Sequence, residues 1–155
     1  MEERVQRAVE LFKSGYNCSQ SVVAAYADMY GFTEEQALRM SASFGGGIGR
    51  MRLTCGAACG LFVLAGLDNG SVDATDREGK GANYALVQQL AEEFKKRNGS
   101  LTCAELLGLK KPEGVTTPEE RTAQYYAKRP CVKMVEEAAR IWKEHLELKK
   151  ESCNI

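Results

Sequence analysis

The sequence predicts an all-α fold, a compact bundle of about seven helices. Apolar residues recur at intervals of three and four positions along most of the chain, as on the buried face of an amphipathic helix. Capping residues and glycines stand at the ends of these segments. No segment shows the alternation that marks a pair of strands. The length of 155 residues suits one domain, and we expect residues 1–155 to share a single core.

A first helix is expected to end at Gly15, and a second follows directly. The first segment repeats apolar residues at helical spacing up to this glycine, a residue type that commonly follows a helix end. Asn17 can cap a second helix through its side chain, and Gln20 stands where it completes a capping box. We expect this second helix to reach about Tyr30.

A third helix, a glycine-rich loop and a buried helix are expected next. Thr33 and Gln36 repeat the capping-box pattern and predict a short helix. It ends at the glycines of residues 45–49, which favour a tight turn or a close approach of the backbone to another group. Thr54 is expected to cap an apolar helix over about residues 55–67. Because many of its residues are glycine or alanine, neighbouring helices can pack closely against it, which places it at the centre of the bundle.

The second half of the chain predicts four further helices. A loop over residues 68–81 precedes a long amphipathic helix over about residues 83–97. Thr102 is expected to cap a short helix, and Thr117, followed by proline and two glutamates, is expected to start another. A last amphipathic helix covers about residues 131–150.

Charge and hydropathy exclude several classes of function. Lysine plus arginine and aspartate plus glutamate both number 21, so no global positive field draws the chain to nucleic acid. The N-terminal segment lacks the apolar stretch of a signal peptide, and no apolar run approaches the length of a membrane span. We therefore expect a cytoplasmic protein that neither binds nucleic acid nor inserts into a membrane.

The six cysteines are the main candidates for chemistry. In a reducing compartment they favour metal binding or redox chemistry over static disulfides. Four of them, Cys18, Cys55, Cys103 and Cys131, directly follow an expected cap or a proline, so we place them in the first turn of a helix. Unpaired backbone N–H groups and the helix dipole favour a thiolate there, which predicts lowered pKa values. Because the four are far apart in the sequence, they can meet only through the tertiary structure.

The two other cysteines and the glycine-rich loop are expected to have more limited roles. Cys59 lies inside the apolar helix, where it is either a small buried side chain or an additional thiol. Cys153 is expected to be exposed and to have no role. The glycines of residues 45–49 are expected to let the backbone pack close to the cysteine site, where Arg50 and Arg52 can offset thiolate charge.

The cysteine pattern is similar to that of the C_GCAxxG_C_C family, whose members are described as redox-active. In this chain the motif is formed, in order, by Cys18, by the run Cys55-Gly56-Ala57-Ala58-Cys59-Gly60, and by Cys103 and Cys131. The resemblance implies an all-helical domain and makes Cys18, Cys55, Cys103 and Cys131 the four signature cysteines. It assigns no role to Cys59 or Cys153 and brings no substrate or partner with it.

Three kinds of chemistry fit four such cysteines. The leading hypothesis is that they bind an iron–sulfur cluster or a similar metal centre, in an electron carrier or redox sensor with an unidentified redox partner. A second is a thiol–disulfide oxidoreductase that uses a cysteine pair without metal. A third is a structural zinc site that holds the helices together. The small residues of the apolar helix also permit a homodimer without requiring one.

Overall fold

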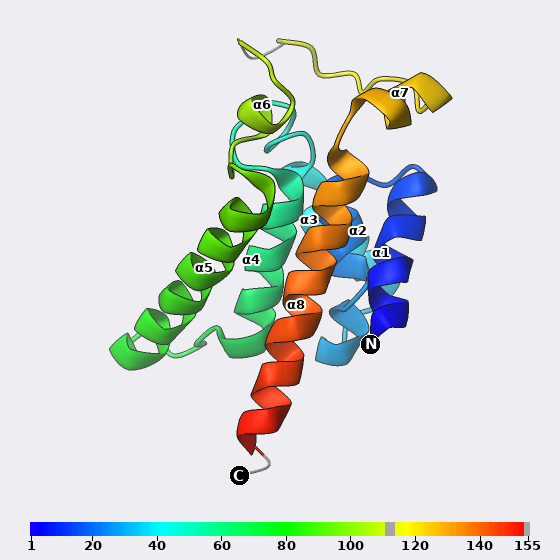
Figure 1. Cartoon of the computed structure of the whole chain (residues 1–155). Helices are drawn as coiled ribbons and strands as arrows, with labels where there is room; N and C mark the ends of the chain where they lie inside the picture. The colour runs from blue at the N-terminus through cyan, green and yellow to red at the C-terminus, as the bar shows by residue number, and fades with distance from the viewer. Residues whose placement is uncertain (111–113, 154–155) are drawn as a thin grey trace.

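The computed structural model describes residues 1–110 and 114–153 and confirms the all-α prediction (Figure 1). Within these ranges the only strand-like pairing is a single antiparallel bridge between Thr54 and Thr102. The α-helices are α1 (Glu2–Lys13), α2 (Cys18–Ala24), α3 (Glu34–Ser41), α4 (Gly56–Asn69), α5 (Arg77–Asn98), α6 (Cys103–Leu106), α7 (Ala123–Lys128) and α8 (Cys131–Cys153). Two 3₁₀ helices, η1 (Ala27–Tyr30) and η2 (Ala42–Phe44), follow α2 and α3.

Two capping boxes start α2 and α3, as the sequence predicts. The Asn17 side chain accepts a hydrogen bond from the Gln20 N–H at 2.9 Å, and the Gln20 side chain accepts one from the Asn17 N–H at 3.1 Å. Thr33 and Gln36 form the same reciprocal pair at α3. Each box satisfies backbone donors that would otherwise be unpaired and so fixes where the helix begins. The helix expected to reach Tyr30 is instead divided into α2 and η1.

The expected start of α5 is wrong by about two turns. The Asp76 side chain accepts a hydrogen bond from the Gly79 N–H at 2.8 Å, and the helix therefore begins at Arg77 instead of near residue 83. Gly79 and Gly81 lie in its first turns, where glycine is unfavourable by propensity. The aspartate cap thus outweighs the low helix propensity of the two glycines.

The helix expected to start at Thr117 does not form there. Residues 114–122 run without helical structure, and the Thr117 carbonyl accepts a hydrogen bond from the Arg50 side chain instead of from a helix N–H. α7 begins at Ala123, because the side chain of Thr122 accepts a hydrogen bond from the Tyr125 N–H at 3.2 Å. A tertiary contact therefore engages Thr117 outside a helix, and the local Thr122 cap sets where α7 starts.

The core is built around α4 and α8. α8 packs against α1, α2, α4 and α5, and α4 packs against α2, α5 and α8. The apolar helix expected at the centre is thus α4, whose residues 56–61 are all buried. Trp142 of α8 is completely buried, and the hydroxyl of Tyr26, also buried, donates a hydrogen bond to the Ala139 carbonyl at 2.7 Å. These contacts hold α8 along the axis of the bundle.

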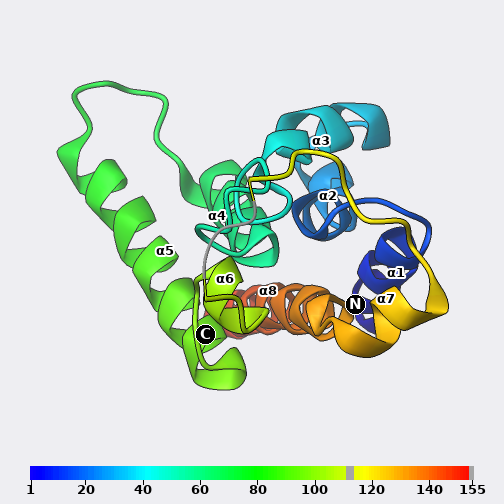
Figure 2. The ribbon, with the colours of Figure 1, turned by 90° about the horizontal axis from the view of Figure 1, so that it is seen from above.

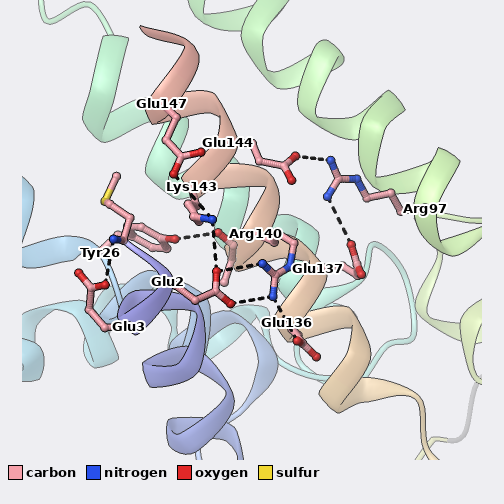
Figure 3. Close-up of polar contacts among 12 residues, drawn as sticks. Glu2, Glu3, Tyr26, Arg97, Glu136, Glu137, Arg140, Lys143, Glu144 and Glu147 are labelled. Atoms are coloured by element: carbon pink, nitrogen blue, oxygen red, sulfur yellow. Dashed lines mark hydrogen bonds and ion pairs between the residues drawn. The ribbon is translucent and has the colours of Figure 1, made fainter. Parts of the chain in front are cut away.

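Ion pairs attach α1 and α5 to the outer sides of α8 (Figure 3). Arg140 of α8 donates two hydrogen bonds to the Glu2 carboxylate, each of 3.0 Å. On the other side, Arg97 of α5 pairs with Glu137 and Glu144 of α8. Ion pairs at the surface, as these partly exposed ones are, typically contribute about 1 kcal/mol or less each. Their main effect is to fix the orientation of α8, the helix that begins with Cys131.

The structure also bears on membrane association. No helix in the described part of the chain combines the length and the apolar character that crossing a bilayer requires.

Candidate functional site

Four helices begin around one cavity at one end of the bundle. Cys18, Cys103 and Cys131 are the first residues of α2, α6 and α8, and Cys55 directly precedes α4 as its N-cap residue. All four line a cavity of about 290 Å³. The structure therefore brings together the four cysteines that the sequence singles out. Cys55 lies one position earlier than expected: it takes the N-cap position of α4, and Thr54, the expected cap, forms the bridge with Thr102 instead.

A left-handed loop between η2 and α4 forms one wall of this cavity. Residues 46–50 have φ values of 68°, 73°, 67°, 57° and 61°, so five consecutive residues adopt the left-handed conformation. Two of the five are not glycine, and each such residue costs about 1–2 kcal/mol. At Gly47, a Cβ would lie 2.5 Å from the Cys103 Cβ and 2.8 Å from the Arg52 Cα. The close packing expected of these glycines is therefore observed against the start of α6.

Positive charge surrounds the cysteines. Among the described residues, the ionised side chains that line the cavity, apart from the thiols, are one acid, Glu119, and four arginines, Arg50, Arg52, Arg121 and Arg129. Arg52 is only 4% exposed, and its Nη1 donates a hydrogen bond to the Cys103 Sγ at 3.7 Å. The cavity is consequently suited to an anionic group.

Residues 114–122 cross this end of the bundle as an exposed segment. Figure 2 looks onto this end, with the segment in yellow leading to α7. Arginine side chains hold it in place: Arg50 donates to the Val115 carbonyl at 3.0 Å, and Arg129 pairs with Glu119 at 2.6 Å. Arg121, within the segment, donates to backbone carbonyls of α1 and of the turn after it. Part of the cavity wall therefore depends on side-chain hydrogen bonds instead of on helix packing.

Cys18 and Cys131 form a directly interacting pair. The Cys18 thiol donates a hydrogen bond to the Cys131 sulfur, which lowers the pKa of Cys131 to about 7, with Arg129 and Arg52 acting in the same direction. The same bond, together with the exclusion of water, raises the pKa of Cys18 well above its usual range. Cys18 thus keeps its proton, whereas the Cys131 thiol ionises readily.

The other two thiols of the cavity are held neutral. Burial raises the pKa of Cys55 to about 12, although the backbone N–H groups of Ala57 and Ala58 act against this shift. Burial also raises the pKa of Cys103, and the nearby Arg52 only partly offsets it. The expectation of lowered pKa values at all four helix starts is therefore wrong for every cysteine except Cys131. Loss of water and repulsion between neighbouring sulfurs outweigh the helix dipole at these positions.

The two remaining cysteines lie outside the cavity lining. Cys59 is buried in α4, and its thiol lies 3.8 Å from the Thr54 carbonyl, to which it donates a weak hydrogen bond. Cys153 is exposed at the end of α8, as expected. All six cysteines are free thiols. Within the described ranges, no group of three or more His, Cys, Asp or Glu side chains is arranged to hold one metal ion.

The structure adds site residues that the sequence reasoning missed. Arg121 and Arg129 reach the cavity from the segment before α8, far in the sequence from the glycine-rich loop. The one local signal was the position of Arg129, two residues before Cys131. For Arg121 there was no local signal, because its position depends on hydrogen bonds to the Phe12 and Tyr16 carbonyls.

Comparison with known protein families identifies a relationship over most of the chain. A family model described as "Putative redox-active protein (C_GCAxxG_C_C)" matches residues 16–145, a range that includes the four cavity cysteines and excludes Cys153. The resemblance drawn from the cysteine pattern is thereby confirmed. No curated protein and no solved structure matches the chain.

Proposed function

The chain belongs to the C_GCAxxG_C_C family of redox-active proteins, and on this premise we propose that it carries or senses electrons through an iron–sulfur cluster. The proposed ligands are Cys18, Cys55, Cys103 and Cys131. The observation that carries the proposal is their position: four cysteines from the starts of four separate helices line one cavity together with arginines. A cavity of about 290 Å³ has room for a group much larger than a single ion.

The donor set supports a cluster by its chemistry. Thiolates are the usual ligands of iron–sulfur clusters, and four of them complete the common cysteine ligation. The three thiols with raised pKa values lose their protons when a metal takes the proton's place, so binding is expected to release protons. The helix starts also bring unpaired backbone N–H groups to this end of the bundle, and hydrogen bonds to sulfur tune reduction potentials.

The positive charges around the cavity favour the binding of an anionic group. Arg129, Arg52 and Arg121 all favour the thiolate form of Cys131. A buried negative charge is stable only when positive charge and hydrogen-bond donors compensate for the lost water. In this proposal the arginines compensate the charge of the thiolate-bound cluster.

A bound cluster supplies one-electron chemistry, and the chain's own residues determine its surroundings. Cys55 and Cys103 are buried, at 5% and 8% exposure, so they keep water from one side of the site. Cys18 and Cys131 are only half-buried. We propose that electrons enter and leave on the side of Cys18 and Cys131.

A second candidate function follows from the contact between Cys18 and Cys131. In a thiol–disulfide oxidoreductase, the Cys131 thiolate attacks a substrate disulfide and releases one substrate thiolate. Cys18 then loses its proton and attacks the mixed disulfide at the Cys131 sulfur, which forms a Cys18–Cys131 disulfide and releases the second thiolate. The substrate gains two electrons and the cysteine pair loses two. The hydrogen bond between the two sulfurs and the pKa of about 7 at Cys131 favour this alternative.

Analysis of anaerobically purified protein distinguishes the two candidates. We expect iron, acid-labile sulfide and a visible absorption band in the wild type, and their loss in Cys55→Ser. Cys55 lies outside the Cys18–Cys131 pair, so this variant removes a cluster ligand and leaves the pair intact. Cys153→Ser is the matched control, because Cys153 is exposed and distant, and it should retain iron and sulfide.

Two other experimental outcomes would replace the cluster proposal with one of the alternative functions. Metal-free wild type that forms a reversible disulfide with oxidised glutathione, unchanged in Cys55→Ser but lost in Cys131→Ser, establishes the thiol–disulfide function. Colourless protein with stoichiometric zinc indicates the structural site of the third hypothesis.

A further inference from the structure

We infer that Arg52 sets the reduction potential of the cysteine site, because it places a buried positive charge beside Cys103 that favours the more negative, reduced form. The inference rests on the proposed redox function, and it deepens that proposal by naming the residue that tunes the site. It applies both to a cluster and to a thiol pair in this cavity.

The first support is the burial of Arg52 against a cavity sulfur. Its side chain is almost entirely enclosed, and its Nη1 lies 3.7 Å from the Cys103 Sγ. Its charge also acts on Cys131. Arginine is rarely buried to this extent, because the guanidinium loses its hydration. The guanidinium interacts more favourably with the reduced site than with the oxidised site, because the reduced site carries more negative charge.

The second support is the rigid attachment of Arg52 to the start of α6. The Ala104 N–H donates a hydrogen bond to the Arg52 carbonyl at 3.2 Å, and the Cys103 N–H donates one to the Leu53 carbonyl at 2.6 Å. The Arg52 N–H in turn donates to the Gly46 carbonyl at 3.2 Å. The backbone that carries the guanidinium is therefore bonded directly to the backbone that carries the sulfur.

The third support is the strained backbone of Arg52. Its φ of 60° lies in the left-handed region, which glycine and asparagine adopt more easily than arginine. Among the neighbouring positions with positive φ, residues 46, 47 and 49 are glycine, whereas Ile48 and Arg50 are not. Strain of this kind persists where the surrounding structure needs the side chain in place.

The other arginines of the cavity have different contacts. Arg50 donates to backbone carbonyls of residues 115 and 117, and Arg121 donates to the carbonyls of Phe12 and Tyr16. Arg129 pairs with the Glu119 carboxylate. Arg50 is a useful comparison for Arg52, because it has the same charge, lies in the same loop and has a φ of 61°, but its guanidinium donates to the carbonyls of residues 115 and 117.

The reduction can be written for either redox group. A cluster takes up one electron from an external reductant such as dithionite and gains one negative charge. A Cys18–Cys131 disulfide is reduced by two glutathione thiols to one thiol and one thiolate, with formation of glutathione disulfide and release of one proton. In both cases the product is more negative, so loss of the Arg52 charge should lower the potential.

The test compares the midpoint potentials of Arg52→Asn, Arg52→Lys and Arg50→Asn with that of the wild type. Asparagine tolerates positive φ, so it removes the charge without adding backbone strain. We expect Arg52→Asn to shift the one-electron equilibrium at least about tenfold toward the oxidised form, a fall of about 59 mV. Arg52→Lys, which retains a charge, should keep most of the potential, and Arg50→Asn should lower it clearly less than Arg52→Asn does. Circular dichroism checks folding, and Arg52→Gln replaces the asparagine variant if that variant unfolds.

Iron and sulfide content reports on the proposed function separately from the potential. If the wild type lacks iron, the same variants are compared by the equilibrium of the Cys18–Cys131 disulfide with glutathione, in which Arg52→Asn should again favour the disulfide about tenfold. Equal potentials for Arg52→Asn and the wild type, or equal falls for Arg52→Asn and Arg50→Asn, would overturn the inference. So would a wild type with neither a cluster nor a glutathione-dependent disulfide.

Discussion

Gly47 is the residue at which the left-handed loop comes closest to Cys103. Two requirements coincide there, a φ of 73° and the absence of a side chain, because a Cβ would overlap the Cys103 Cβ at 2.5 Å. Gly49 meets only the first requirement: its φ is 57°, but a Cβ there would have no heavy atom within 4 Å. Substituting each glycine in turn therefore separates the free-energy cost of the left-handed conformation from the cost of steric overlap.

Gly47→Ala is expected to destabilise the protein more than Gly49→Ala. The left-handed conformation of alanine costs about 1–2 kcal/mol in each variant. Overlap with Cys103 should add roughly 1–3 kcal/mol in Gly47→Ala only. Urea denaturation of the metal-free proteins measures the difference in unfolding free energy. Equal losses in the two variants would show that the loop moves away from Cys103 without cost.

The residues of the candidate site were predictable only where the signal was local. Cys18 could be placed at a helix start because the Asn17–Gln20 capping box lies within four residues of sequence. The pKa values could not be predicted, because they depend on burial and on sulfurs from other helices. Arg121 was missed for the same reason, since its contacts are made across the tertiary structure.

Among the elements, α5 shows how one side chain can determine a helix boundary. Asp76 accepts a hydrogen bond from the Gly79 N–H with one carboxylate oxygen and one from the Ser71 hydroxyl, at 3.0 Å, with the other. It therefore caps the helix and also holds the start of the loop before it, at Ser71. Asp73, in the same loop, accepts hydrogen bonds from Thr75 but caps no helix.

Asp76→Ala is expected to lower the free energy of unfolding by about 1 kcal/mol, the usual cost of losing an N-cap. It should also unwind the first turns of α5, because Gly79 and Gly81 have low helix propensity. Asp73→Ala is the control and should change stability by less than about 0.5 kcal/mol. Thermal and urea unfolding followed by circular dichroism compare the two, and an equal effect would contradict the assignment of the cap.

Elements with strong local signals were predicted well. The amphipathic periodicity of α1 and α8 and the capping boxes of α2 and α3 all lie within their own segments. α7 was misplaced because the chain before it is held by Arg50, a residue more than sixty positions away in sequence. Local sequence cannot report such a contact.

For the whole molecule, the main division is between the helix bundle and the cysteine end. α8 is surrounded by α1, α2, α4 and α5, and their side chains form the buried core. α6 and α7 are short helices at the cysteine end, and residues 114–122 between them are almost all exposed. Stability should therefore be unequal along the chain, because regions with few buried contacts open more easily.

Hydrogen exchange should reveal this division. In metal-free protein, backbone amides of residues 100–110 and 114–130 are expected to exchange faster than those of α4 and α8. Reconstitution with iron and sulfide should slow exchange in α6 in particular and raise the melting temperature, because a ligand that binds only the folded state stabilises it. Removal of the iron with a chelator should reverse both changes. Uniform exchange along the metal-free chain would contradict this picture.

The order of the four cavity cysteines along the chain has a consequence for biosynthesis. Cys18, Cys55 and Cys103 are synthesised first, but the cavity also needs Cys131, the first residue of the helix around which α1, α2, α4 and α5 pack. A chain still growing on the ribosome therefore lacks a wall of the cavity until α8 has emerged. Any group held by all four cysteines must be inserted after translation has passed α8, so maturation has to follow folding of the bundle or accompany its last step.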